Sequence, residues 1–306
     1  MENMGKDLTD YMNRQKLNQQ FNKLVEDALN DSDVQAFIQA NKDRLSQETV
    51  TRSAAKIYEY VIEKKKLANG QTTLAPGYAP KLVLNNHFID VSYEPTASLL
   101  QEREQAALHA RVKSINMPRD IEQAKIDSFD RTYRFDALIK ATAFIGAYRQ
   151  APHDFHQALY LSGQFGVGKT YLLGAIANEL ALSGFETTLI HFPTFAVEMK
   201  NAIGQNNVLE KVNVIKKAPI LMIDDIGADA MSAWVRDEVL GIILQYRMQE
   251  QLATFFSSNF TMTELETHLT TSNQGDEPVK AGRIMQRVRY LAQEIEVGGQ
   301  NRRLQP

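Results

Sequence analysis

Apolar side chains recur every three to four positions in three stretches near the start of the chain, which is the spacing of one helical face. These stretches cover residues 17–28, 34–38 and 50–62. Glycines and prolines within residues 69–80 predict a loop. The pattern over residues 81–91 predicts a β-hairpin that turns at Asn85 and Asn86, because asparagine tolerates left-handed backbone geometry. We therefore expect a small helical domain with a hairpin at residues 1–95.

A polar, charged stretch over residues 98–111 separates this module from the rest of the chain. A solvated helix and a linker have the same composition, and we expect a partly helical linker at residues 96–113. From residue 114, short apolar runs predict strands at 158–161, 187–192, 220–223 and 253–258. Helical spacing predicts helices at 135–148, 172–180, 195–203 and 235–246. This alternation predicts an α/β domain at residues 114–306, with a parallel sheet flanked by helices.

Residues 163–170, between the first of these strands and its helix, read GQFGVGKT. This is the complete spacing of a phosphate-binding loop. Its glycines let backbone N–H groups approach phosphate oxygens, and the helix N-terminus adds positive potential. Lys169 is expected at the β- and γ-phosphates, and the Thr170 hydroxyl at Mg²⁺. The residues expected to bind nucleotide are Gly163, Gln164, Phe165, Gly166, Val167, Gly168, Lys169, Thr170 and Tyr171.

Polar side chains follow the next two buried strands. Asp224 comes directly after residues 220–223 and is expected to partner Mg²⁺, directly or through water. Asp225 would lie beside the γ-phosphate and orient a water molecule. Asn259 ends the following strand, where its amide can hold that water or a phosphate oxygen. Such residues also occur in ordinary turns, but their order after the phosphate loop favours a nucleotide site.

Arginines cluster near the end of the chain, although its net charge is −3. Arg283 and Arg287 are four residues apart and therefore share one side of a predicted helix. ATPases that work as rings supply such a guanidinium to the γ-phosphate bound by the next subunit. Arg302 could reach the nucleotide of its own subunit, with Arg303 as the alternative.

The composition limits the class of protein. Hydrophobic residues make up 43% of the chain, enough for a core, and no apolar run is long enough to cross a membrane. The first residues lack the features of a secretion signal. The absence of cysteine excludes disulfides and thiolate metal sites and fits a reducing compartment. We therefore expect a cytoplasmic protein that does not bind membranes.

These elements, in this order, resemble the AAA+ ATPases, and more closely the bacterial replicative-helicase loaders within them. The resemblance is carried by GQFGVGKT, LMIDDIGADAMSAWVRDEVLGIILQYRM, FFSSN and GRIMQRVRYLA. It implies an N-terminal domain that grips the hexameric replicative helicase. It also implies a bacterial AAA+ domain that binds ATP with Mg²⁺, contacts single-stranded DNA and self-associates around the helicase.

The resemblance also assigns roles by position. Lys169, Thr170, Asp224, Asp225 and Asn259 take the nucleotide roles, Arg287 takes the arginine-finger role, and Arg302 takes the second-sensor role. Relatives can carry a cysteine-rich zinc site where this chain reads LANGQTTLAPGYAP, so no zinc is expected here. The hairpin must instead be held by packing of Leu82, Leu84, Phe88, Ile89 and Val91.

The residues that would contact DNA stay open at this point. Single-stranded DNA binding requires basic groups and exposed aromatic rings. Phe192, Phe195 and Lys200 are candidates, and Lys211, Lys216 and Lys217 could add charge. A core position for the phenylalanines is at least as compatible with the pattern, and a solvated face is favoured for the lysines.

Three functions compete. The first is an ATP-dependent helicase loader. The second is the related transposition helper ATPase, and the third is an adaptor that holds ATP with little turnover. A small-molecule kinase is disfavoured, because the sequence shows no lid segment.

Overall fold

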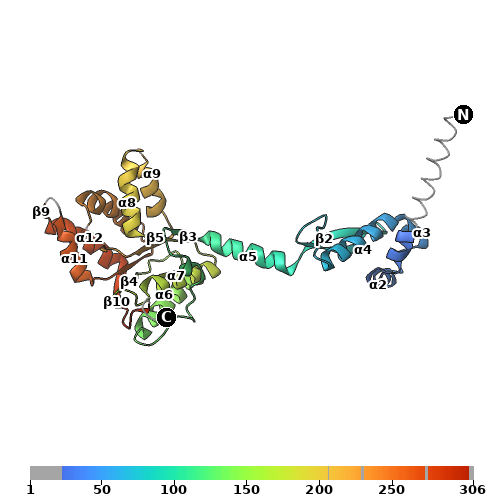
Figure 1. Cartoon of the computed structure of the whole chain (residues 1–306), viewed down its shortest axis with the longest axis horizontal. Helices are drawn as coiled ribbons and strands as arrows, with labels where there is room; N and C mark the ends of the chain where they lie inside the picture. The colour runs from blue at the N-terminus through green and yellow to red at the C-terminus, as the bar shows by residue number, and fades with distance from the viewer. Residues whose placement is uncertain (1–22, 206, 229–230, 273–274, 303–306) are drawn as a thin grey trace. The chain divides into compact units, whose positions relative to one another are not determined.

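The computed structural model describes residues 23–205, 207–228, 231–272 and 275–302 (Figure 1). The chain divides into two compact units, Met1–Glu104 and Gln105–Pro306. The first predicted helix, over residues 17–28, lies partly outside the described residues, and residues 23–29 are helical. Within the described ranges, no helix combines the length and the apolar character that a bilayer span requires.

The first unit packs helices against a hairpin. Besides the helical residues 23–29, the helices are α2 (Ser32–Ala40), α3 (Gln47–Arg52) and α4 (Ala54–Ala68), and the strands are β1 (Tyr78–Asn85) and β2 (Phe88–Pro95). Asp31 and Ser46 cap α2 and α3 by accepting backbone N–H groups of their first turns. The backbone N–H of Ile89 donates to the Ser53 hydroxyl at 2.9 Å, which ties the hairpin to the helices. The core of this unit contains Ala28, Val34, Val50, Ile57, Tyr60, Val61, Leu82 and Ile89.

The predicted hairpin is present, but its turn lies one residue later than expected. Asn85 is paired with Phe88, so the two-residue turn is formed by Asn86 and His87. Their φ angles are 47° and 67°, the left-handed geometry that suits the twist of a two-residue hairpin. Leu82 and Ile89 are buried as expected, whereas Phe88 is 38% exposed and contributes little to the packing that holds the hairpin.

The segment expected as a linker is mostly one helix, α5 (Ala97–Arg111), none of whose side chains is buried. It leads into β3 (Val112–Ile115), which pairs with β5 (Thr187–His191) and was not predicted. The second unit therefore begins its sheet at Val112.

A six-stranded parallel sheet in the order β10-β4-β7-β6-β5-β3 forms the second unit. The remaining strands are β4 (Ala158–Ser162), β6 (Ile220–Asp224), β7 (Thr254–Ser258) and β10 (Ala292–Glu296). The sequence-based prediction of an α/β fold with a parallel sheet is confirmed. Because β4, β6 and β7 are central neighbours, the residues that follow them meet at one edge.

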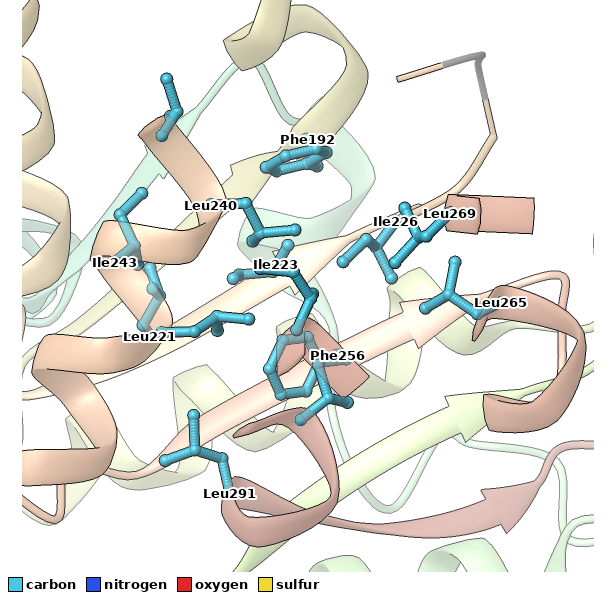
Figure 2. Packing of buried hydrophobic residues seen from close by; sticks show 14 of the residues in the cluster. Phe192, Leu221, Ile223, Ile226, Leu240, Ile243, Phe256, Leu265, Leu269 and Leu291 are labelled. Atoms are coloured by element: carbon cyan, nitrogen blue, oxygen red, sulfur yellow. The ribbon is translucent and has the colours of Figure 1, made fainter. Parts of the chain in front are cut away.

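Alternate residues of each central strand enter different cores. In β6, Ile220 and Met222 face the core that includes α6 (Phe135–Gln150) and α7 (Lys169–Leu182). Leu221 and Ile223 face the opposite core, where Figure 2 shows Ile223 between Leu240 and Phe256. Helices therefore cover both faces of the sheet (Figure 1), as the uniformly apolar strands require.

The second core is covered by α8 (Phe192–Ile203), α9 (Val208–Lys216), a π-helical turn η2 (Val235–Leu240), α10 (Gly241–Gln249), α11 (Met262–Thr270) and α12 (Pro278–Leu291). The remaining elements are the 3₁₀ turn η1 (Arg119–Gln123) and the short strands β8 (Thr271–Ser272) and β9 (Gly275–Asp276). The helix predicted at 235–246 thus begins with a π turn, and the helix predicted from residue 195 begins at Phe192.

For two candidate DNA contacts, the structure decides for the core alternative. Phe192 and Phe195 are each 2% exposed and belong to the second core, so neither ring can stack on a base. Their positions on the first turn of α8 place them in the same buried cluster as Ile223 and Val235 rather than in solvent. Lys200 and Lys217 are exposed, and their contact with DNA stays a prediction.

Candidate nucleotide-binding site

The phosphate loop connects the end of β4 with the start of α7. Gly163, Gly166 and Gly168 all have positive φ, so the glycine pattern matches the backbone conformation. Close packing adds a second reason for glycine. A Cβ atom at Gly166 would lie 1.9 Å from Asn301 Oδ1, and one at Gly163 would lie 2.3 Å from the Val297 carbonyl oxygen. The loop therefore packs closely against the segment after β10.

Lys169 is the buried cation of this loop. Its Nζ donates to the carbonyl oxygens of Gly163 at 2.7 Å and Gln164 at 2.8 Å. It also donates to Asn259 Oδ1 at 2.8 Å. The ammonium is thus fixed between the phosphate loop and the end of β7, where a phosphate oxygen can replace one of these acceptors.

Thr170 and Asp224 face each other across the sheet edge. The Thr170 hydroxyl lies 3.0 Å from both carboxylate oxygens of Asp224, and the Ser257 hydroxyl donates to Asp224 Oδ1 at 2.5 Å. Asp224 is buried. Burial raises the pKa of this carboxyl above its usual range, against the lowering effect of the Ser257 and Thr170 hydrogen bonds. A divalent cation bound at these oxygens would offset the free-energy cost of burying the charged carboxylate.

The Asn259 amide connects the Lys169 ammonium with the Asp225 carboxylate. While its Oδ1 accepts from Lys169, its Nδ2 donates to Asp225 Oδ1 at 3.1 Å. Asp225 has φ 59°, a left-handed conformation that aspartate tolerates, and its backbone N–H donates to the Ser257 hydroxyl at 3.0 Å. Asp225 is therefore held outside the strand, half-buried, and lines the same cavity as the phosphate loop.

A cavity of about 460 Å³ contains these groups. It is lined by Pro118, Ile121, Phe129, Phe165, Gly166, Gly168, Lys169, Thr170, Tyr171, His191, Asp224, Asp225, Ser257, Asn259 and Arg302. Three predicted nucleotide-binding residues do not line it. Val167 is buried in the core beneath the loop, while Gly163 and Gln164 present carbonyl oxygens to Lys169.

Five lining residues were missed by the sequence reasoning. His191 and Ser257 lie at the carboxyl ends of β5 and β7, and the argument that identified Asp224 could have found them. His191 Nε2 is 3.9 Å from Asp225 Oδ2, and its Nδ1 lies 2.8 Å from the Thr194 hydroxyl. The other three, Pro118, Ile121 and Phe129, come from the connection before α6, where no motif signals them.

One wall of the cavity is aromatic. The rings of Phe129 and Tyr171 are nearly parallel, with an interplanar angle of 14° and centroids 6.2 Å apart. The Tyr171 hydroxyl accepts the backbone N–H of Lys125 at 3.1 Å, which fixes the ring. A flat apolar wall beside a cationic loop suits a planar base joined to phosphates.

The two predicted arginines occupy different places. Arg302 lines the cavity, pairs with Asp130, and donates its backbone N–H to the Gly166 carbonyl oxygen at 3.1 Å. Arg303 lies outside the described residues. Arg287 is not among the lining residues of the cavity, and its Nη1 donates to the Gly241 carbonyl oxygen at 3.0 Å. Partial burial, and then the nearby charge of Arg283, lower the pKa of Arg287.

The donors at the sheet edge fit a hard cation. Thr170 Oγ1 and the Asp224 carboxylate are oxygen donors of the kind that Mg²⁺ takes alongside phosphates. Among the described residues, this site included, no group of three or more histidine, aspartate or glutamate side chains is arranged to hold a metal ion by itself.

Two protein-family models match the chain. Residues 1–93 match the model of the primosomal protein DnaI N-terminus, and residues 77–306 match the model of IstB-like ATP binding proteins. The replicative helicase loader DnaI of Bacillus subtilis (strain 168) is 38% identical over 311 residues, which cover 99% of each protein.

Solved structures agree with these matches. A crystal structure of DnaI has a TM-score of 0.57 and 46% identity, and covers 65% of this chain and 99% of that chain. A putative primosome component from Streptococcus pyogenes serotype M3 has a TM-score of 0.53 and 39% identity, and covers 65% of this chain and 98% of that chain. The similarity in sequence extends over both units of the chain.

Proposed function

This chain belongs to the DnaI family of replicative helicase loaders, and from that membership we propose how it works. The protein binds the hexameric replicative DNA helicase and uses ATP to place it on single-stranded DNA when replication starts or restarts. Its compartment is the bacterial cytoplasm. The observation that carries the proposal is that residues 1–93 match the DnaI N-terminal model while the following unit contains a complete phosphate site.

The N-terminal match separates the proposal from the transposition-helper alternative. Both functions would use an ATP-binding unit of this kind, and residues 77–306 match a model of IstB-like ATP binding proteins, which does not name the loaders. The N-terminal unit discriminates between the two functions, because here it matches a primosomal protein. We assign helicase binding to this unit, whose core and hairpin are held by apolar packing without cysteine.

The nucleotide site supports Mg²⁺-dependent ATP hydrolysis. Lys169 binds the β- and γ-phosphates, since its Nζ already lies between the loop and Asn259. Thr170 and Asp224 would hold Mg²⁺, which would neutralise phosphate charge. The remaining phosphate-loop residues bind through backbone N–H groups, and Phe129 and Tyr171 cover the base.

Asp225 and Asn259 act on the water that attacks the γ-phosphate, Asp225 directly and Asn259 by positioning it. The Asp225 carboxylate lines the same cavity as the loop and accepts a proton from the attacking water, whose oxygen bonds to the γ-phosphorus while the bond to the β–γ bridging oxygen breaks and ADP leaves. The Asn259 amide holds this carboxylate on one side and Lys169 on the other, so the base and the cation keep a fixed separation. This set of residues favours turnover over the adaptor that merely holds ATP.

Arg287 completes the site of a neighbouring subunit. Because it does not line the cavity of its own unit, its guanidinium can stabilise transition-state charge only across an interface. Self-association on the helicase and on single-stranded DNA therefore stimulates hydrolysis.

A mass measurement tests the proposal. The full chain is mixed with the hexameric helicase of its host, with and without ATP and Mg²⁺, and the masses of the complexes are recorded. We expect a helicase complex whose composition depends on ATP in the wild type and not in Lys169→Ala. Absence of any helicase complex, together with a complex formed in a parallel mixture with a transposase, would establish the transposition-helper alternative. A helicase complex without measurable phosphate release would establish the adaptor.

A further inference from the structure

Arg134 is a buried charged side chain that the proposed roles leave unused. It immediately precedes α6 and is 3% exposed. Its Nε donates to the Gly298 carbonyl oxygen at 3.0 Å, and its Nη2 donates to that of Gln300 at 3.4 Å. Its guanidinium also lies 5.8 Å from the ring centroid of Phe129, in the aromatic wall of the nucleotide cavity. Arg134 therefore ties this wall to the segment after β10.

That segment, residues 297–302, lies directly against the phosphate loop. The backbone N–H of Val297 donates to the Ser162 carbonyl oxygen at 2.7 Å, just before the loop. At the other end, the Arg302 N–H donates to Gly166 at 3.1 Å. The Asn301 amide fills the space that a side chain at Gly166 would need. A displacement of the phosphate loop would therefore also displace the segment that carries Arg302.

Asp130 lies between two guanidinium groups. Its Oδ2 pairs with Arg302 Nη2 and lies 3.6 Å from Arg134 Nη1, too far for a hydrogen bond. Arg134 Nη1 is buried and has no hydrogen-bond partner among the described residues. The Thr132 backbone N–H, at 2.9 Å, and then Arg302 lower the pKa of Asp130 to about 2, so its carboxylate is charged at neutral pH.

We infer that Asp130 and Arg134 are positioning residues for Arg302. Asp130 holds the Arg302 guanidinium at the rim of the nucleotide cavity. A bound phosphate then competes for Arg302, and Asp130 turns to the Nη1–H of Arg134. The exchange replaces one charge-assisted hydrogen bond by another and satisfies a buried donor, so Arg302 is released at little cost. The inference rests on the proposed binding of ATP at this site.

The first test is the affinity of the full chain for ATP with Mg²⁺, measured by calorimetry. Asp130→Asn removes the charge that competes with phosphate, so ATP should bind about 2- to 5-fold tighter, the range of an exposed ion pair. Asp130→Glu keeps the carboxylate and should behave as the wild type. In an Arg302→Met background, Asp130→Asn should change nothing, because no guanidinium remains to be released.

The second test concerns Arg134. Arg134→Gln keeps an amide donor for the Gly298 carbonyl but removes the group to which Asp130 turns. It should weaken ATP binding when Asp130 is present and have no effect beside Asp130→Asn. An Arg134 that merely stabilised the fold would weaken binding equally in both backgrounds, and thermal melts of each variant would detect such a loss.

The outcomes are distinct. Unchanged or weaker binding in Asp130→Asn, tightening that survives in Arg302→Met, or equal effects of Arg134→Gln in both backgrounds would each overturn the inference. Failure of the wild type to bind ATP would instead overturn the proposed function.

Discussion

Arg287→Ala tests whether hydrolysis needs a residue from a neighbouring subunit. Arg287 lies on α12, half-buried, with Nη1 3.0 Å from the Gly241 carbonyl oxygen at the start of α10. It is not among the residues that line the nucleotide cavity of its own unit. The substitution therefore removes one contact between two helices and no contact with ATP bound in the same chain.

The expected magnitudes differ widely between stability and turnover. A hydrogen bond from a charged donor contributes about 1.5–3 kcal/mol to the free energy of unfolding. Each kcal/mol lowers the melting temperature by about 2–4 °C in a unit of this size. The affinity of the isolated chain for ATP should stay within about 2-fold of wild type. Turnover in the assembly should fall by about 10³-fold, the effect of losing an arginine finger.

Mixing experiments test directly whether Arg287 acts on the nucleotide of a neighbouring subunit. ATP hydrolysis is recorded with helicase or single-stranded DNA present, for Arg287→Ala, for Lys169→Ala and for their mixture. Each variant alone should be nearly inactive. The mixture should regain part of the activity, because an interface between an intact loop and an intact Arg287 forms again. Arg283→Ala is the matched control, since Arg283 is one helical turn earlier and exposed.

A weaker affinity of dilute, monomeric Arg287→Ala for ATP would refute this reasoning, because it would mean that the residue acts on its own nucleotide. The same conclusion would follow if the mixture recovered nothing. Arg283 or Arg289 would then be the better candidate for the finger. Arg289 already pairs with Glu266 at 2.6 Å, whereas Arg283 is exposed on α12.

Four further predictions concern single changes. Lys169→Ala should weaken ATP binding by about 10- to 100-fold in calorimetry, because phosphate loses a charge-assisted donor; unchanged binding would remove the phosphate-loop assignment. Asp225→Asn should keep ATP bound but slow phosphate release, since Asp224 is retained; a parallel loss of binding and turnover would indicate a structural or metal role. A fragment of residues 1–104 should fold and bind helicase in the presence of a chelator, and unfolding on chelation would contradict this. Lys66 and then the Leu74 N–H lower the pKa of buried Glu63, so its contribution to stability is present above the ordinary glutamate pKa and is lost as pH falls through the lowered value. Glu63→Gln should therefore flatten the acid limb of the fragment's stability curve and cost about 1–3 kcal/mol at neutral pH; an unchanged limb would exclude this role.

The central strands were predictable because burial on both faces makes them short continuous apolar runs. Ile220 and Leu221 enter different cores, yet both must be apolar. β3 escaped prediction because an edge strand of four residues, including Lys113 and Ser114, has no such run. The hairpin turn shifted by one residue because a propensity for left-handed geometry does not determine the register of pairing.

Part of the nucleotide site could be predicted from the local sequence. The phosphate loop and Asp224 follow buried strands directly, so a general rule places them at one edge of the sheet. The aromatic wall could not be found in this way, because Phe129 belongs to an irregular connection and meets Tyr171 only in the folded chain. The core positions of Phe192 and Phe195 were one of two alternatives at the level of sequence, because a hydrophobic ring at a helix start is compatible with a core or with a surface.

The sequence by itself determined the alternation of strands and helices, the phosphate loop, the acids that follow the strand and the family. These properties are local, since each depends on residue types at fixed spacing. Tertiary structure decided which side chains meet across the chain. Asn259 bridges Lys169 and Asp225, and Asp130 lies between Arg134 and Arg302, over separations of up to 172 residues. No periodicity encodes such contacts, because they depend on the order of the strands and on how each connection packs over the sheet edge.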